Sequence, residues 1–107
     1  MLSNGSIGGY KRIIIKCGST DLRCGIPSLT TQLSMFYGVE FEEGVLYVLC
    51  GRSRRKLKGL IRFQDGFMLV NLLLDPKKRL NWICDTDELR EISEEQLQRI
   101  LHGEDIK

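Results

Sequence analysis

The chain has 107 residues, of which 42% are hydrophobic and 28% charged, with only two prolines. This length and composition fit one compact domain with a core of its own, and they exclude a largely disordered chain. The longest apolar run, Phe67 to Leu74, is too short to cross a bilayer, so we expect no membrane segment.

Charge is divided unevenly along the chain. Residues 1–83 hold thirteen Lys/Arg and six Asp/Glu, whereas residues 84–107 hold three Lys/Arg and eight Asp/Glu. Such asymmetry indicates either an electrostatic partner or one end of the chain folding back on the other. The sequence leaves both alternatives open.

Cysteine usage favours a cytoplasmic protein with reduced thiols. The four cysteines, Cys17, Cys24, Cys50 and Cys84, form no Cys-x-x-Cys pair, so we expect no zinc site and no other cofactor. Cys50 and Cys84 lie in apolar runs, where a thiol behaves as a small buried hydrophobe. The N-terminus shows no secretory apolar segment, which agrees with a cytoplasmic location.

The first half of the chain predicts a flexible N-terminus over residues 1–9 and a single domain over residues 10–107. Lys11 to Cys17 is β-branched between cations and predicts a strand, which the polar loop CGSTDLRCGIP follows. Pro27 suits a first helical turn, and Gly38 suits a helix end. The predicted helix between them has one apolar face, made of Ile26, Leu29, Leu33 and Phe36.

The middle of the chain predicts two further strands. They run from Val45 to Cys50 and from Lys56 to Gln64, and residues 51–55 make the turn between them. Side chains of the second strand alternate between two faces. One face is apolar, with Leu57, Ile61 and Phe63; the other is polar, with Lys56, Lys58, Arg62 and Gln64.

A hairpin and the last two elements complete the prediction. Asp65-Gly66 is a hairpin signal that leads into a strand from Phe67 to Leu74. Because this strand is apolar on both faces, we expect it to be central in the sheet, or to have one face covered by a helix or a partner. A fifth strand is predicted from Leu80 to Cys84.

The C-terminal helix has clear local signals. Ser93 and Gln96 form a capping box, Ile92 and Leu97 occupy the positions of a hydrophobic staple, and Gly103 follows the last turn. The resulting order β-α-β-β-β-β-α predicts an α+β fold with two helices and a mostly antiparallel sheet of four to five strands.

A cluster of cations, called the basic hairpin below, is the first candidate site. Six cations without an intervening carboxylate could contact the phosphates of a duplex, and arginine offers a fork for bidentate recognition. The alternative is a solvated strand whose charges prevent edge-to-edge aggregation. The cluster consists of Arg52, Arg54, Arg55, Lys56, Lys58 and Arg62, and Lys77, Lys78 and Arg79 could extend it.

Other candidate sites favour structural roles. Asp21 could pair with Arg23 or accept backbone N–H bonds, and a nucleophilic Cys17 or Cys24 has no evident base, since the single histidine, His102, lies in the C-terminal helix. Carboxylates outside the acidic end are dispersed, so we expect neither a metal-dependent nuclease nor another enzyme.

The acidic stretch Asp85 to Glu95 allows three interpretations. It could supply helix N-terminal charge, cover the basic hairpin within the molecule, or dock a basic protein.

Several motifs together resemble the small accessory protein (TnpB or Orf2-like) of insertion sequences of family sixty-six, which is distinct from the RNA-guided nuclease also called TnpB. CGSTDLRCGI, LYVLCGRSRRKLKGL, GFMLV and ISEEQLQRILHGEDI follow one another at the family's spacing, over about Cys17 to Ile106. The family's motif residues here are Cys17, Gly18, Thr20, Asp21, Arg23, Gly25, Arg52, Arg54, Lys58, Gly66, Phe67, Trp82 and Gly103.

The chain departs from the family pattern at two places. Ile61 and Arg62 stand where the family tends to have aromatic residues after the basic strand. Leu72 and Leu73 stand where the family usually has a Lys-Arg pair, and the cations of residues 77–79 follow a few positions later.

The resemblance implies a non-catalytic accessory factor of transposition, encoded beside a separate bacterial transposase. The leading hypothesis is a protein that binds or positions double-stranded DNA at the element's ends through the basic hairpin. The rival is an adaptor that docks on the cognate transposase through the exposed side of the Phe67–Leu74 strand or the acidic stretch. Homodimerisation through an uncovered sheet face is compatible with both.

Overall fold

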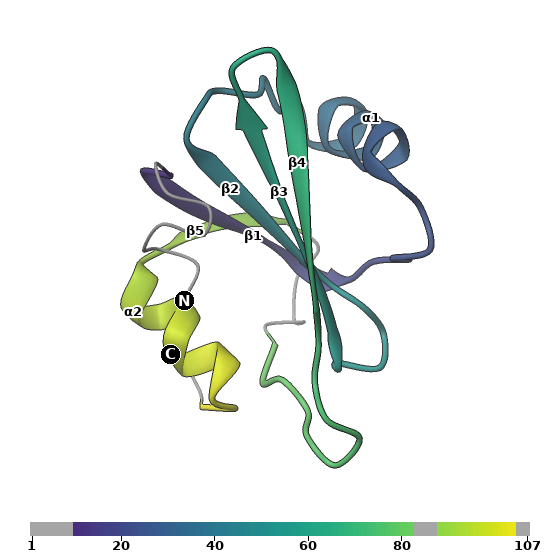
Figure 1. The fold of residues 1–107 in the computed structure, drawn as a ribbon, viewed down its shortest axis with the longest axis vertical. Helices are drawn as coiled ribbons and strands as arrows, with labels where there is room; N and C mark the ends of the chain where they lie inside the picture. Colours follow the sequence, from purple (N-terminus) through teal and green to yellow (C-terminus); the bar gives the residue numbers. More distant parts are fainter. Residues whose placement is uncertain (1–9, 83–87, 105–107) are drawn as a thin grey trace.

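The computed structural model describes residues 10–82 and 88–104. Its order is β-α-β-β-β-β-α, as the sequence predicts, and the sheet has five strands (Figure 1). The elements are β1 (Arg12–Ser19), α1 (Ile26–Tyr37), β2 (Val45–Cys50), β3 (Lys56–Phe63), β4 (Gly66–Leu73), β5 (Leu89–Ile92) and α2 (Glu94–Leu101).

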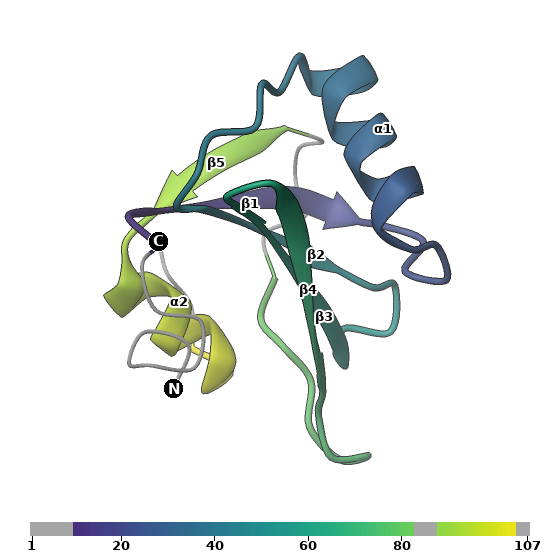
Figure 2. The same cartoon turned by 45° about the horizontal axis from the view of Figure 1, so that its top comes forward.

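The strands lie in the order β4-β3-β2-β1-β5. β1 and β2 are parallel, with α1 in the connection between them, and every other pair of neighbours is antiparallel. The prediction of an α+β fold with a mostly antiparallel sheet is therefore confirmed. α1 covers one face of the sheet, and α2 lies on the other side (Figures 1 and 2).

α1 begins and ends where the sequence predicts. Pro27 occupies its first turn, and Gly38 ends it at φ 66° in the left-handed region that glycine adopts without strain. Leu29 and Leu33 are buried, but Phe36 is 76% exposed, so its assignment to the core face is wrong. A period of 3.6 residues carries the stripe from Leu33 to a position nearer Tyr37, and Tyr37 packs against the core instead.

α2 confirms the local signals of its sequence. The Ser93 hydroxyl accepts from the Gln96 N–H at 3.1 Å, and the Gln96 side chain accepts from the Ser93 N–H at 2.9 Å. Leu97 and Ile100 are buried in the same apolar cluster as Ile92, so the helix docks on the sheet through the predicted stripe.

β3 has apolar partners on both of its faces. Leu57 and Ile61 are buried toward α2 as predicted, whereas Phe63 at the strand end is 51% exposed. Leu60 is also fully buried, on the side of Lys58, because α1 covers that face. The prediction of one apolar and one polar face is therefore too simple for this strand.

The hairpin between β3 and β4 is confirmed, but its turn lies one residue earlier than predicted. Phe63 pairs with Gly66, so Gln64 and Asp65 form the two-residue loop, and Gln64 has φ 51°. Gly66 is already the first residue of β4.

β4 is an edge strand, so the first alternative, a central position, is wrong. The second alternative, a face covered by a helix, is confirmed, because α1 covers one side of the strand. Its two apolar faces have another origin. Phe67 and Leu69 pack toward α1, and Met68 and Val70 pack toward the opposite cluster. An edge strand whose two faces both pack against apolar core residues has the same apolar composition as a central strand.

The fifth strand was predicted at Leu80 to Cys84 but is β5. Residues 80–82 have no strand structure, and the rest of the predicted strand lies outside the described residues. Leu80 and Trp82 are 3% exposed because they fill the core beneath the sheet. β5 instead pairs antiparallel with β1, where Ile92 lies opposite Ile13.

Candidate nucleic-acid interface

The candidate interface lies at the end of the sheet where the parallel strands β1 and β2 finish. β3 begins and β4 finishes at the same end, so residues distant in sequence meet there. Between them is an open groove of about 680 Å³, called the basic groove below. Its lining consists of Ser19, Thr20, Asp21, Leu22, Arg23, Gly51, Arg52, Ser53, Lys56, Leu57, Lys58, Asn71, Leu72 and Leu73.

Positive charge predominates in the basic groove. Four of its lining side chains are cations, Arg23, Arg52, Lys56 and Lys58, against a single carboxylate, Asp21. Arg52 and Lys56 are exposed to solvent. The groove brings residues of the basic hairpin together with the loop after β1, an association that the sequence did not predict.

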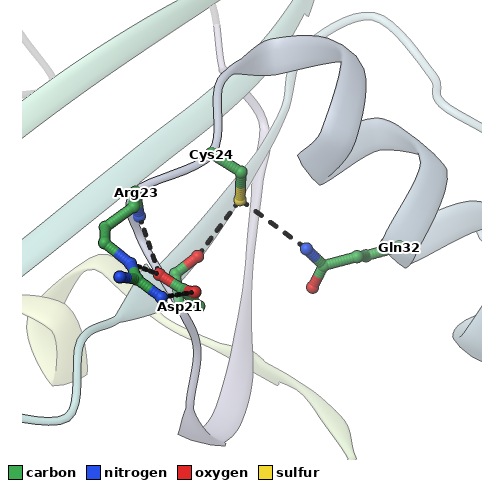
Figure 3. Close-up of polar contacts among 4 residues, drawn as sticks. All are labelled: Asp21, Arg23, Cys24 and Gln32. Atoms are coloured by element: carbon green, nitrogen blue, oxygen red, sulfur yellow. Dashed lines mark hydrogen bonds and ion pairs between the residues drawn. The ribbon is translucent and has the colours of Figure 1, made fainter.

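Asp21 and Arg23 form a bidentate ion pair, called the clasp below, at the rim of the basic groove (Figure 3). The Arg23 guanidinium donates to both carboxylate oxygens, at 3.0 and 2.9 Å, and the Arg23 backbone N–H donates to Oδ1 at 3.0 Å. Both interactions that the sequence suggested for Asp21 are therefore present. The Arg23 side-chain bonds, and then its backbone N–H, lower the pKa of Asp21 from 3.8 to about 2.

We expect the clasp to persist down to about pH 4 and to open as the pH falls toward 2. The folded-state pKa of Asp21 lies below its ordinary value of 3.8, so the contribution of the ion pair to stability is fully present above pH 3.8 and is lost progressively as the pH falls through about 2. An NMR titration of the Asp21 carboxyl carbon should give a pKa of about 2. Arg23→Gln should raise this pKa, while Arg90→Gln on β5 should leave it unchanged. Titration of the wild-type group near 3.8 would contradict the clasp.

The Cys24 thiol makes two hydrogen bonds next to this clasp. Its thiol donates to the Asp21 carbonyl at 3.1 Å and accepts from Gln32 Nε2 at 3.6 Å (Figure 3). Lys58 Nζ donates to the Cys24 carbonyl at 2.9 Å, which holds the loop against β3. These contacts fix the loop's path along one wall of the groove.

Three cations of the basic hairpin bind backbone carbonyls. Besides Lys58, Arg54 donates to the Trp82 carbonyl at 3.4 Å, and Arg55 donates to the Leu74 carbonyl at 3.3 Å. Both arginines are half-buried, and Arg54 reaches φ 62° in the turn. These side chains tie the β2–β3 turn to the segment after β4. The sequence could not show this, because a carbonyl acceptor carries no residue signature.

The remaining predicted cations are Arg62 on β3 and the three cations of residues 77–79. Arg62 lies over the Phe67 ring, 4.9 Å from its centroid, in a cation–π contact across the β3–β4 pair. Lys77, Lys78 and Arg79 are exposed, and Arg79 donates to the carbonyls of two neighbouring residues.

Most of the family motif residues have structural roles in the strands and loops around the groove. Gly18 has φ 77° where the register of β1 against β2 shifts, and its carbonyl accepts from Trp82 Nε1 at 3.1 Å. Cys17 is buried in the core, and Phe67 packs edge-on against Phe41. Thr20 is 8% exposed, lines the groove, and has a buried hydroxyl without a hydrogen-bond partner. A polar ligand in the groove could supply that partner.

Two acidic residues near the C-terminus form ion pairs with arginines outside the basic hairpin. Glu91 forms a bidentate pair with Arg12 at 2.9 and 3.2 Å, and Glu104 lies 3.8 Å from Arg99. Two further glutamates occupy the first turn of α2, where the helix dipole favours them. Asp85 and Asp87, which begin the acidic stretch, lie outside the described residues.

The described ranges, 10–82 and 88–104, lack the features of a metal site and of a membrane span. They contain no group of three or more His, Cys, Asp or Glu side chains placed to hold a metal ion. They also contain no helix with the length and apolar character needed to cross a membrane.

Comparison with known proteins gives one family and one relative. A family model described as "IS66 Orf2 like protein" matches residues 11–107. The chain is also similar to the "Uncharacterized protein y4hO" of Sinorhizobium fredii (strain NBRC 101917 / NGR234). The two are 34% identical over 98 residues, which cover 92% of this chain and 84% of the relative. No solved structure matches.

Proposed function

The chain belongs to the IS66 Orf2-like family of transposition-associated accessory proteins, and on that premise we propose that it binds duplex DNA through the basic groove. In this proposal the protein positions DNA for a separate transposase and performs no chemistry itself. The DNA backbone is held by the open cations of the groove and of the loop after β4.

The observation that carries the proposal is the charge balance of the groove. Its one carboxylate, Asp21, is hydrogen-bonded to Arg23 and has only a weaker electrostatic interaction with Arg52, so the four cations keep a net positive charge. Cations gathered without neighbouring carboxylates repel one another, and a polyanion relieves that repulsion while releasing its own counterions. Phosphate groups also accept charge-assisted hydrogen bonds from arginine and lysine side chains.

A second set of cations lies at the same end of the molecule. Leu74 N–H donates to the Arg55 carbonyl at 2.8 Å, and Leu80 N–H donates to the Arg54 carbonyl at 2.7 Å. Both ends of the segment that carries residues 77–79 are thus fastened to the β2–β3 turn, next to Arg52. Its three exposed cations extend the positive surface beyond the groove.

A salt titration tests the proposal. Wild-type protein should bind duplex DNA with an affinity that falls linearly on a log–log plot against salt, with a slope of about −0.9 per phosphate contact. Duplexes carrying the element's terminal repeats should be compared with random duplexes of equal length. Tighter binding to the repeats would indicate sequence readout, and equal affinities would leave phosphate contacts alone. No binding at low salt would refute the proposal.

An adaptor function is the second candidate, and exposed apolar side chains on α1 favour it. Met35 and Phe36, consecutive residues in the last turn of the helix, are 74% and 76% exposed. Such a pair fits a protein partner better than it fits DNA. An adaptor should co-purify with the transposase at high salt, and Phe36→Asp should abolish that association while Arg52→Glu leaves it intact.

A further inference from the structure

The outer side of β4 presents backbone hydrogen-bond groups that have no neighbouring strand within the described sheet. Which residues present them follows from the β3–β4 register. The Leu74 N–H donates to the Arg55 carbonyl, so these two residues are a hydrogen-bonded pair. Bonded pairs alternate along an antiparallel ladder. The N–H and C=O groups of Phe67, Leu69, Asn71 and Leu73 therefore point away from β3.

The composition of this edge is unusual for a solvent-facing strand. β4 has eight residues and contains no Lys, Arg, Asp or Glu, although exposed edges are ordinarily protected by charge or by shortness. Leu72 and Leu73 at its end are 39% and 61% exposed. The opposite edge of the sheet shows that protection: β5 has four residues and carries Arg90 and Glu91.

We propose that β4 pairs with β4 of a second copy of the chain, antiparallel, about a two-fold axis that passes beside Val70. In this register Phe67 lies opposite the partner's Leu73, and Leu69 lies opposite the partner's Asn71. The four outward-facing residues of each chain then exchange about eight N–H···O bonds. The two sheets join into one continuous sheet of both chains.

The edge of β4 is self-complementary, and for this reason we assign a second copy of the chain as the partner that pairs with it. The two-fold arrangement places the exposed Leu73 against Phe67 and the exposed Leu72 against Met68, while Val70 meets its own copy. No charged side chain of β4 is opposed to a like charge, because the strand has none. A closed isologous contact of this kind also leaves no further edge open at β4.

The pairing has a consequence for the basic groove. Lys56, Lys58 and Asn71 lie on the α1 side of the sheet, and a two-fold axis perpendicular to the sheet keeps both copies of that side together. The dimer would present two grooves on the same face. The pairing itself does not depend on DNA binding, so the two proposals can fail separately.

Disulfide trapping tests the register. In a background where Cys24 and Cys84 are replaced by Ser, Val70→Cys places two thiols across a non-hydrogen-bonded pair with a Cα–Cα distance of about 4.5 Å. Mild oxidation should convert most of this variant into a covalent dimer. Met68→Cys is the matched control, because its own copy lies four residues away along the strand, and it should remain uncrosslinked.

A proline variant tests the edge independently. Asn71→Pro removes an outward N–H without removing a β3–β4 bond, so the variant should stay folded by circular dichroism but elute as a monomer where the wild type elutes as a dimer. A monomeric wild type at 100-fold higher concentration than that of the binding assays would overturn the proposal. So would a dimer that survives Asn71→Pro and fails to crosslink through Val70→Cys. A transposase complex abolished by Asn71→Pro, with a monomeric free protein, would assign the edge to the transposase instead.

Discussion

Replacing Trp82 with Ala is expected to lower the free energy of unfolding by about 3–5 kcal/mol. Trp82 is 3% exposed and lies in the apolar cluster beneath the sheet with Leu97 and Ile100. Its indole Nε1–H donates to the carbonyls of Lys16 and Gly18, both at 3.1 Å. The substitution would therefore open a cavity and also remove the donor for two carbonyls at the bulge of β1.

A second variant separates these two contributions. Trp82→Phe keeps most of the aromatic volume but removes the indole donor, and it should cost about 1–3 kcal/mol. Because Trp82 is the only tryptophan in the chain, unfolding by urea should be followed by far-ultraviolet circular dichroism rather than by fluorescence.

The matched control for Trp82 is Phe36→Ala, which removes an aromatic ring that is 76% exposed. It should change stability by no more than about 0.5 kcal/mol. Equal effects of Trp82→Ala and Phe36→Ala would mean that the segment after β4 does not pack beneath the sheet. In that case the exposed cations of residues 77–79 would not be fastened beside the groove.

The double variant Arg52→Ala/Lys56→Ala should weaken duplex DNA binding by about 50- to 100-fold at 0.1 M salt. Each phosphate contact contributes about 0.9 to the log–log salt slope, which corresponds to about an eightfold gain in affinity at 0.1 M salt. Two lost contacts should therefore also reduce the slope by about two. Both side chains are exposed, so neither substitution should disturb the fold.

Arg90→Ala on β5 is the control for this measurement. Arg90 is also exposed, but it lies on β5, the edge of the sheet opposite β4, and it is not among the residues that line the groove. It removes one positive charge and should leave the salt slope unchanged. If Arg90→Ala and a single Arg52→Ala variant reduce affinity equally, net charge rather than the groove governs binding. If the double variant binds like the wild type, the groove is not the DNA contact.

Local signals predicted most elements well, because the interactions that form them lie close in sequence. Pro27 and Gly38 bracket α1, Ser93 and Gln96 cap α2, a short apolar run marks β2, and alternation marks β3. The larger errors concern which segments pair as strands and in what order. β4 has the composition of a central strand, and Leu80 to Trp82 have the composition of a strand, but pairing depends on contacts with distant residues.

In the candidate site, too, local sequence showed which residues are present but not which contacts they make, as the basic hairpin illustrates. Its cations were visible in the sequence, but their separate roles were not. Arg54, Arg55 and Lys58 donate to carbonyls of residues 82, 74 and 24. Lys58 also lines the groove, together with the exposed Arg52 and Lys56. The sequence assigned Arg23 to a loop pair and to the family motif, and the structure places it in the same groove.

The sequence by itself determined that this chain is a small α+β domain of the IS66 Orf2-like family with a cationic turn between two strands. Only the tertiary structure decided which of those cations remain open to an anion and which strand lies at the edge. The physical reason is that hydrogen bonds from side chains to backbone carbonyls, and the pairing of strands, join residues that are far apart in the sequence. Such partners leave no local pattern, because any residue can offer a carbonyl.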